Sequence, residues 1–423
     1  MNKVFPRIIL ACFFFVFVIP DVSPLYLSWD RAIPQFLYLT TLNIISLCYL
    51  FKIGLLNETI NNVYNKQIIM CYSVFVIICF ISILFAENQI ESIVTISKYL
   101  SYLFTLLCIY SLANYIGKSY INFIIYIVAF SLFIESISLV YNTLDMIYIK
   151  EIGFARDNEL LRTFSGNINV GANSLIYKIS FLFYLIYKTD KLKLLSFLYF
   201  ILFLVFSSLF ILLSRSSFIG LSIVMLVFFI WANKRHIYKS GIITAVLISS
   251  YLFVQTSINA DNPNEITDRI SSISINTQDD SVDERFRYYS HALHSISINP
   301  LFGIGIGNWK LKSIEYDASD IEGYIIPYHA HNDFLQIAAE IGIIGLVFFM
   351  MIIIIPSYNI LLKIFNKEIK LFELVILLSI VAYVIDSMLN FPIARPMTHI
   401  YLLFILVSYM IHKNYKIEIH ETV

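Results

Sequence analysis

The residues best suited to chemistry in this sequence are two histidines that directly precede a long apolar run. They lie in the segment 329–333, which reads His-Ala-His-Asn-Asp. Imidazole has a pKa of about 6.5, so a neutral histidine can take the proton of a hydroxyl group at neutral pH. A zinc site is the alternative, because His329, His331 and Asp333 are all possible zinc ligands. A general base is favoured, since no further cluster of Cys or His accompanies the pair, and no metal is predicted.

Three arginines have the chemistry to bind an anion. Arg215 lies in a very short polar turn between two apolar runs, while Arg285 and Arg287 open a helical segment in an acidic stretch. A guanidinium group stays charged at any working pH and binds phosphate through two hydrogen bonds. The alternative for Arg215 is a topological anchor. The alternative for the other two is an ion pair with Asp283 or Glu284.

The elements that must position these side chains are membrane helices. The chain has 423 residues, of which 59% are hydrophobic and 14% are charged. Soluble domains are nearer to half apolar and a quarter charged, so the composition indicates an integral membrane protein. The net charge of zero argues against a nucleic-acid partner. The five cysteines all fall in apolar runs with no Cys-x-x-Cys pair, so neither disulfides nor a zinc framework is predicted.

Twelve runs are apolar enough to be spans, each of which needs about 20 residues. The first run is short and follows Lys3 and Arg7, so a signal peptide is its alternative, although no small-residue cleavage site follows it. The runs cover roughly residues 7–20, 33–51, 68–86, 93–117, 119–141, 171–187, 192–213, 216–232, 241–258, 334–356, 371–389 and 396–412.

The distribution of Lys and Arg gives the orientation. With the N-terminus in the cytoplasm, the inner segments hold sixteen of these residues and the short outer loops hold only Arg31, Arg215 and Arg395. This positive-inside bias predicts two cytoplasmic termini and places the histidine pair on the outer face. Lys98 and Lys178 fall within apolar runs, where a charged side chain either faces a cavity or partner or extends to the membrane surface.

The longest outer segment covers residues 259–333, and so long a connection in a compact bundle is usually functional. A capping-box pattern at 281–284 and apolar residues at helical spacing predict an amphipathic helix over 282–297. The glycines at 303, 305 and 307 follow. They are predicted to form a turn that brings backbone close to a neighbour, rather than a nucleotide loop, because no strand precedes them.

The spacing from the histidines into the apolar run is specific. After His331-Asn332 come nine residues, then Gly342, two more residues and Gly345. Three other stretches carry motifs that belong with this spacing, in the right order along the chain and on the same predicted membrane face. They are 214–220, 285–309 with its core Pro300-Leu301-Phe302-Gly303, and 390–396. With these motifs the sequence resembles the O-antigen ligase and O-antigen polymerase family of bacterial lipid-linked glycan transferases. The resemblance covers about 170–400, and the first five spans match only in hydropathy.

The resemblance implies an all-α, GT-C-like polytopic enzyme of the bacterial inner membrane, with one large periplasmic loop containing short helices. Its parts are an N-terminal transmembrane bundle (1–170), a ligase-like region (171–412) that includes the periplasmic loop 259–333, and a cytoplasmic tail (413–423). It implies a glycan donor carried on undecaprenyl diphosphate, in contact with membrane lipid, and no cofactor. The acceptor is expected to be a lipid A-core sugar or another glycan, as in lipopolysaccharide biosynthesis.

The resemblance also implies roles for residues on the periplasmic side. His331 is expected to be the catalytic base that activates the acceptor hydroxyl. Arg215 and Arg285 are expected to bind the donor diphosphate, where fixed positive charge stabilises a leaving group whose negative charge grows in the transition state. The supporting residues are expected to be His329, Asn332, Arg287 and Arg395.

Three other functions remain open from the sequence. An O-antigen polymerase uses the same donor and another lipid-linked glycan as acceptor, and a third group transfers to a protein side chain. The close fit to the ligase spacing favours ligase over both. A polytopic transporter or flippase is the alternative of another class. It fits less well, because the chain has no repeated halves and no matching pair of Pro- or Gly-broken helices.

Overall fold

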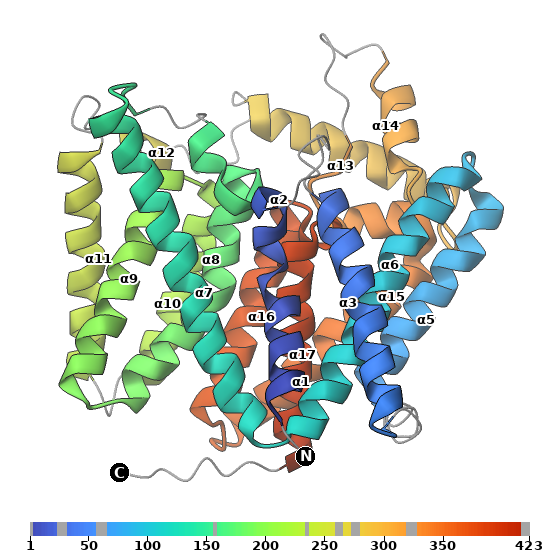
Figure 1. Cartoon of the computed structure of the whole chain (residues 1–423). Coiled ribbons are helices and arrows are strands. Elements are labelled where there is room, and N and C mark those ends of the chain that lie inside the picture. Colours follow the sequence, from blue (N-terminus) through green and yellow to red (C-terminus); the bar gives the residue numbers. More distant parts are fainter. Residues whose placement is uncertain are drawn as a thin grey trace.

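The computed structural model describes residues 3–22, 32–55, 66–154, 159–232, 237–258, 265–271, 280–318 and 328–415. Within these ranges every regular element is a helix (Figure 1). This confirms the prediction of an all-α polytopic membrane protein. The last eight residues of the predicted tail lie outside the described ranges.

A helix coincides with each of the twelve predicted spans. Nine are long and apolar enough by themselves to cross a membrane, among the described residues. The first and the eighth coincide with shorter apolar helices, Val4–Val18 and Arg215–Trp231. The helices are α1 (Val4–Phe14, continued by η1 Phe15–Val18 and α2 Ile19–Val22), α3 (Ala32–Lys52), α5 (Gln67–Ser82), α6 (Gln89–Ile116), α7 (Ser119–Leu144), α8 (Ile168–Lys188), α9 (Leu192–Leu212), α10 (Arg215–Ala232), α11 (Ile237–Ser257), α15 (Asp333–Phe365), α16 (Leu371–Leu389) and α17 (Pro396–Tyr415).

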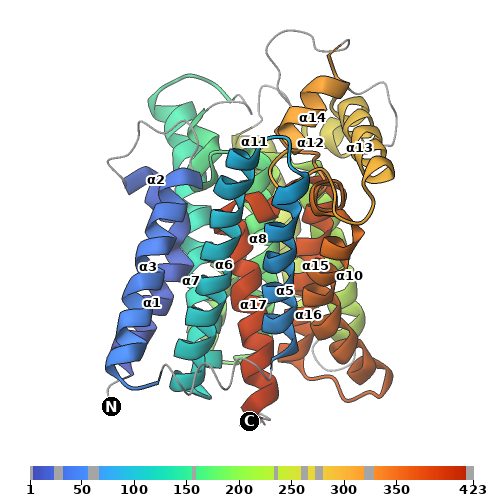
Figure 2. The same ribbon diagram turned by 90° about the vertical axis from the view of Figure 1, so that its right-hand side faces the viewer.

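These helices run side by side as one bundle. In both views α1 begins and α17 ends at the same end of the bundle, and α13 and α14 lie across the opposite end (Figures 1 and 2). α17 stands in the middle, in contact with α6, α7 and α16. Nearly all of its side chains are buried in the protein, as are those of α8. Helices buried on all sides must satisfy their polar groups within the bundle, because lipid offers no partners.

A buried ion pair joins α7 and α8. The Lys178 ammonium group bonds to the Glu135 carboxylate, which also accepts from Ser174 Oγ (3.0 Å) and Tyr401 OH (3.1 Å). The ammonium nitrogen lies 4.2 Å from the centroid of the Tyr401 ring. Of the two predicted alternatives for Lys178, the structure therefore shows the internal partner. Removing one member of such a pair costs roughly 3–5 kcal/mol, because the other charge stays buried.

The outer segment contains three helices, α12 (Glu265–Ser271), α13 (Asp280–Ile298) and α14 (Trp309–Tyr316). The predicted amphipathic helix over 282–297 is confirmed as α13, which packs against α15. Its buried face, with Tyr288 and Ala292, forms a small core with Trp309 and Ala330. Residues 259–264, 272–279 and 319–327 of the predicted loop lie outside the described ranges.

α15 is broken at Gly342, which has φ of 75° and ψ of 177°. The break frees the carbonyl oxygens of Ala339 and Glu340, which accept hydrogen bonds from Ile304 N and Gly305 N at 2.9 Å each. It also frees the amide of Ile343, which donates to Pro300 O at 2.8 Å. The loop after α13 therefore docks on the broken helix through the backbone groups that the break exposes.

Glycines in the loop after α13 and at the break in α15 permit this docking. A Cβ at Gly342 would overlap the Leu301 carbonyl, and a Cβ at Gly303 would overlap the backbone of Glu340. At Gly305 and Gly307 a Cβ would meet Ala86 and Thr95, next to the start of α6. The predicted close approach of the glycine turn is confirmed. Gly342 provides the break that receives the loop.

Candidate active site

A chamber of about 1030 Å³ lies beneath α13 and α14 at the outer-loop end of the bundle. Its size is at the upper end of the range for ligand pockets. Residues from α3, α6, α13, α14 and α15, with Gly307 and the segments 159–167, 328–331 and 391–395, line it. The charged and histidine side chains among them are Lys98, Glu159, Arg162, Glu284, Lys310, His329, His331, Asp333, Glu340 and Arg395.

His331 is held at the chamber wall by its backbone. Its φ of 52° lies in the left-handed region, which residues with a Cβ seldom adopt and which occurs often at functional sites. The next residue, Asn332, caps α15 by accepting from Leu335 N at 3.1 Å. The Tyr289 hydroxyl on α13 lies 3.2 Å from the carbonyl oxygen of His331 and can donate to it. α13 and the start of α15 together hold the backbone that carries the imidazole.

The ring of Phe391 lies between the two histidines. His329 stacks on it with centroids 4.3 Å apart and an interplanar angle of 18°. His331 meets it edge to face at 5.2 Å and 77°. The Arg395 guanidinium is 5.4 Å from the same ring. Segment 391–395 is fixed in turn by the Asp333 carboxylate, which accepts from Ile393 N at 3.0 Å.

Both imidazoles are neutral at pH 7. Burial, with a smaller contribution from the positive charge of Arg285, lowers the pKa of His331 to about 4. Burial, followed by the charges of Arg395, His331 and Lys98, lowers the pKa of His329 to about 3. Within the described part of the chain, neither Nδ1 atom has a hydrogen-bond partner although both are buried. A buried neutral imidazole with an unused nitrogen is available to exchange a proton with a ligand in the chamber.

The structure brings four of the predicted site residues together. His329, His331 and Arg395 line the chamber. Arg285, on α13, is near enough to His331 to lower its pKa. The two histidines thus feel different cations: Arg285 acts on His331, while Arg395 and Lys98 act on His329.

Two other predicted arginines are placed differently. Arg287 forms an ion pair with Asp317, with a nitrogen–oxygen distance of 2.9 Å. Arg287 therefore forms an ion pair, as the alternative prediction had it, but its partner is Asp317 rather than Asp283 or Glu284. Arg215 is the first residue of α10 and is not among the residues that line the chamber.

The neighbourhood of Arg215 is nevertheless joined to the chamber wall. The adjacent Ser216 hydroxyl accepts from Asn173 Nδ2 at 2.9 Å and from Asn390 Nδ2 at 3.3 Å. Both amides also donate to the Asp386 carboxylate, at 2.7 and 2.6 Å. This network connects the start of α10, where Arg215 lies, to the residue before Phe391.

The zinc alternative gains no support. Asp333 directs its carboxylate at the Ile393 amide rather than at the histidines. No group of three or more His, Cys, Asp or Glu that could hold a metal is present among the described residues.

Glu340 is the main site residue that the sequence interpretation missed. Its carboxylate lies at the chamber wall and accepts from Trp309 N at 3.2 Å and from Gln336 Nε2 at 3.3 Å. It therefore holds the start of α14 against the outer half of α15. The available signal was a charged residue inside an apolar run, which is the criterion that singled out Lys98 and Lys178.

Comparisons with known proteins agree with the resemblance in the sequence. Residues 179–350 match the model of the family described as O-antigen ligase. A protein of Rickettsia typhi is 24% identical over 330 residues, covering 75% of this chain and 74% of its own. A protein of Rickettsia prowazekii is 26% identical over 337 residues, covering 74% and 73%. Both are named polysaccharide ligases as a provisional assignment. A third such protein, from Rickettsia conorii, is 27% identical over 184 residues, covering 43% and 42%.

Proposed function

Because residues 179–350 match the model of the O-antigen ligase family, we propose that this multi-pass membrane protein is a metal-independent glycosyltransferase. It moves a glycan from undecaprenyl diphosphate to a hydroxyl of the lipid A-core. The reaction takes place on the periplasmic face of the bacterial inner membrane, with both termini in the cytoplasm. Support for this orientation comes from the bias of Lys and Arg and from α1 beginning and α17 ending at the end away from the chamber.

The observation that carries the proposal is the neutral His331 imidazole at the wall of a large chamber flanked by cations. His331 takes the proton of the acceptor hydroxyl. The oxygen attacks the anomeric carbon of the donor, and the bond from that carbon to the diphosphate oxygen breaks. The diphosphate leaves with the bonding electrons, and the configuration at the anomeric carbon inverts. General-base assistance of this kind typically contributes about 10²–10⁴-fold to the rate.

Arg285 and Arg215 hold the diphosphate in this proposal. Arg285 has a second effect, because its positive charge opposes protonation of His331. When a diphosphate anion binds at Arg285, it offsets that charge and the pKa of His331 rises towards the working pH. A base is most effective when its pKa is near the working pH. Donor binding therefore makes His331 a better base at the moment when it is needed.

The test is transfer by the purified protein from a synthetic lipid-linked donor to a lipid A-core acceptor, in the presence of EDTA. His331→Ala is expected to abolish transfer while the protein still inserts and purifies as the native chain does. Near-normal transfer by that variant would refute the role of His331, and loss of wild-type transfer in EDTA would refute metal independence.

A strain that lacks the gene separates a ligase from a polymerase. Loss of all O-antigen from lipid A, with polymer still on the carrier lipid, is expected for a ligase. Lipid A-core carrying a single repeat unit would instead identify a polymerase.

A further inference from the structure

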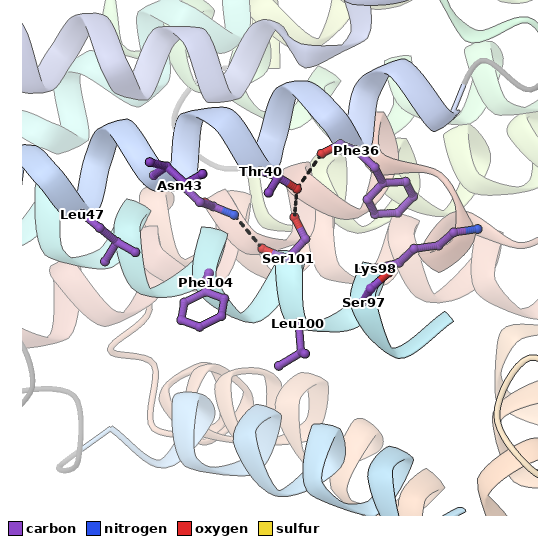
Figure 3. A pocket seen from close by; sticks show the side chains of 10 residues that line it. Phe36, Thr40, Asn43, Leu47, Ser97, Lys98, Leu100, Ser101 and Phe104 are labelled. Carbon is purple, nitrogen blue, oxygen red and sulfur yellow. Dashed lines mark hydrogen bonds between the residues drawn. The ribbon is translucent and has the colours of Figure 1, made fainter. Parts of the chain in front are cut away.

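A groove of about 390 Å³ runs between α3 and α6 on the outside of the bundle (Figure 3). Ile44 on α3 and Phe104 on α6 are exposed at its rim, on a surface that faces lipid when the bundle is in a membrane. The other apolar side chains that line it are Phe36, Leu47 and Leu100. A hydrocarbon chain is the ligand that an apolar groove facing lipid accommodates best.

Polar side chains buried behind the groove join the two helices. Asn43 Nδ2 donates to Ser101 O at 3.0 Å, and Thr105 Oγ1 donates to Asn43 Oδ1 at 3.1 Å. The hydroxyls of Thr40 and Ser101 are 3.4 Å apart (Figure 3). Hydrogen bonds between helices in a membrane resist separation, because the freed groups would face hydrocarbon. The groove is therefore a lasting feature of the α3–α6 pair.

The groove meets the chamber at Phe36 and Lys98, which line both. The Lys98 ammonium lies 5.7 Å from the centroid of the Phe36 ring. From Phe36 to Leu47, α3 descends about 16 Å at 1.5 Å per residue, away from the chamber end of the bundle. A lipid with its head in the chamber and one chain in the groove would thus have the orientation of a lipid in the outer leaflet.

We propose that this groove holds a fatty acyl chain of the acceptor lipid, and that Lys98 binds a phosphate on the saccharide head of that lipid. The inference rests on the glycosyl transfer proposed above and adds where one of its two lipid substrates lies. Lys98 supplies the charge complementarity, since an ammonium at the mouth of an apolar groove matches an anionic head above a hydrocarbon chain.

The geometry of inversion assigns the groove to the acceptor rather than to the donor. In an inverting displacement, the attacking hydroxyl and the departing diphosphate lie on opposite sides of the anomeric carbon. The diphosphate is assigned to Arg215 at the start of α10 and to Arg285 on α13. α3 and α10 stand on different sides of the bundle in both views (Figures 1 and 2). The lipid that approaches along α3 is therefore the one that carries the nucleophile.

The test is photo-crosslinking in a background that cannot turn over. Full-length His331→Ala protein carries benzoylphenylalanine at Leu47, in the groove, or at Ile45, which is exposed on α3 outside the groove. Phosphatidylcholine nanodiscs contain either a labelled, phosphorylated and acylated diglucosamine bearing core sugars, or labelled polyprenyl diphosphate. We expect position 47, in the groove, to capture the acylated glycolipid in clear preference to position 45, and Lys98→Gln to lower capture of the phosphorylated probe at position 47 roughly tenfold, the factor that one charge-assisted contact supplies.

Two outcomes would overturn the assignment of the groove to the acceptor lipid. Preferential capture of polyprenyl diphosphate at position 47 would make the groove a donor site, and equal capture at both positions would mean ordinary membrane lipid only. Lys98→Gln should reduce capture of the phosphorylated probe but not of its dephosphorylated form, while Lys98→Arg should preserve both. An equal loss for both probes would overturn the role of Lys98. Capture needs no turnover, so these results are independent of whether wild-type protein transfers glycan.

Discussion

The break in α15 makes a strong prediction for Gly342→Ala. Gly342 has a φ of 75° and a ψ of 177°, a conformation that glycine adopts far more easily than any residue with a Cβ. Forcing alanine into such a region costs about 1–3 kcal/mol. The new Cβ also overlaps the Leu301 carbonyl. Relieving that overlap separates the docked loop from α15 and weakens the bond from Ile343 N to Pro300 O, which contributes about 1 kcal/mol.

The expected destabilisation is therefore about 2–4 kcal/mol. Gly241→Ala is the matched control, because Gly241 is inside α11 and an added Cβ there meets nothing within 4 Å. Alanine is better than glycine in a helix by up to about 1 kcal/mol, so this control should be neutral or stabilising.

The assay heats both detergent-solubilised variants and follows the remaining monodisperse protein by size-exclusion chromatography, with glycan transfer measured in parallel. Gly342→Ala should lose its monodisperse form at a lower temperature and should transfer more slowly, because the docked loop leads into Gly307, which lines the chamber. A Gly342→Ala protein with the heat resistance of Gly241→Ala and full transfer activity would refute the reasoning.

Three further predictions concern charge. Arg285→Gln removes a positive charge that lowers the pKa of His331, so the acidic limb of the pH profile of kcat/KM should move to higher pH. An unchanged limb or a shift to lower pH would contradict this effect of Arg285. His329→Gln should reduce transfer less than His331→Gln, and an equal loss that added zinc reverses would restore the metal alternative. Lys178→Met should destabilise the protein by roughly 3–5 kcal/mol, and adding Glu135→Leu should recover most of this in thermal unfolding. A double variant no more stable than the single one would count against the buried pair.

Hydropathy predicted where the helices lie, because each span must by itself present enough apolar side chains to cross the membrane. The motif spacing selected His331, since that pattern is local in sequence. Neither signal reports which segments meet in space. Phe391 reaches the histidines only through folding, and the link from the start of α10 to Asn390 likewise joins residues far apart in the sequence. The break at Gly342 was also hidden, because α15 reads as one continuous apolar run and the loop that needs the break comes earlier in the chain.

The buried pair of Lys178 and Glu135 has a consequence for how the protein is made. α8 carries an ammonium group in its middle, which is costly to place in lipid on its own. Glu135 precedes Lys178 by 43 residues, so its helix leaves the ribosome first and is already beside the insertion site when α8 emerges. α7 can then receive α8 during synthesis. The order of the two charges along the chain therefore suits insertion of these helices as a pair.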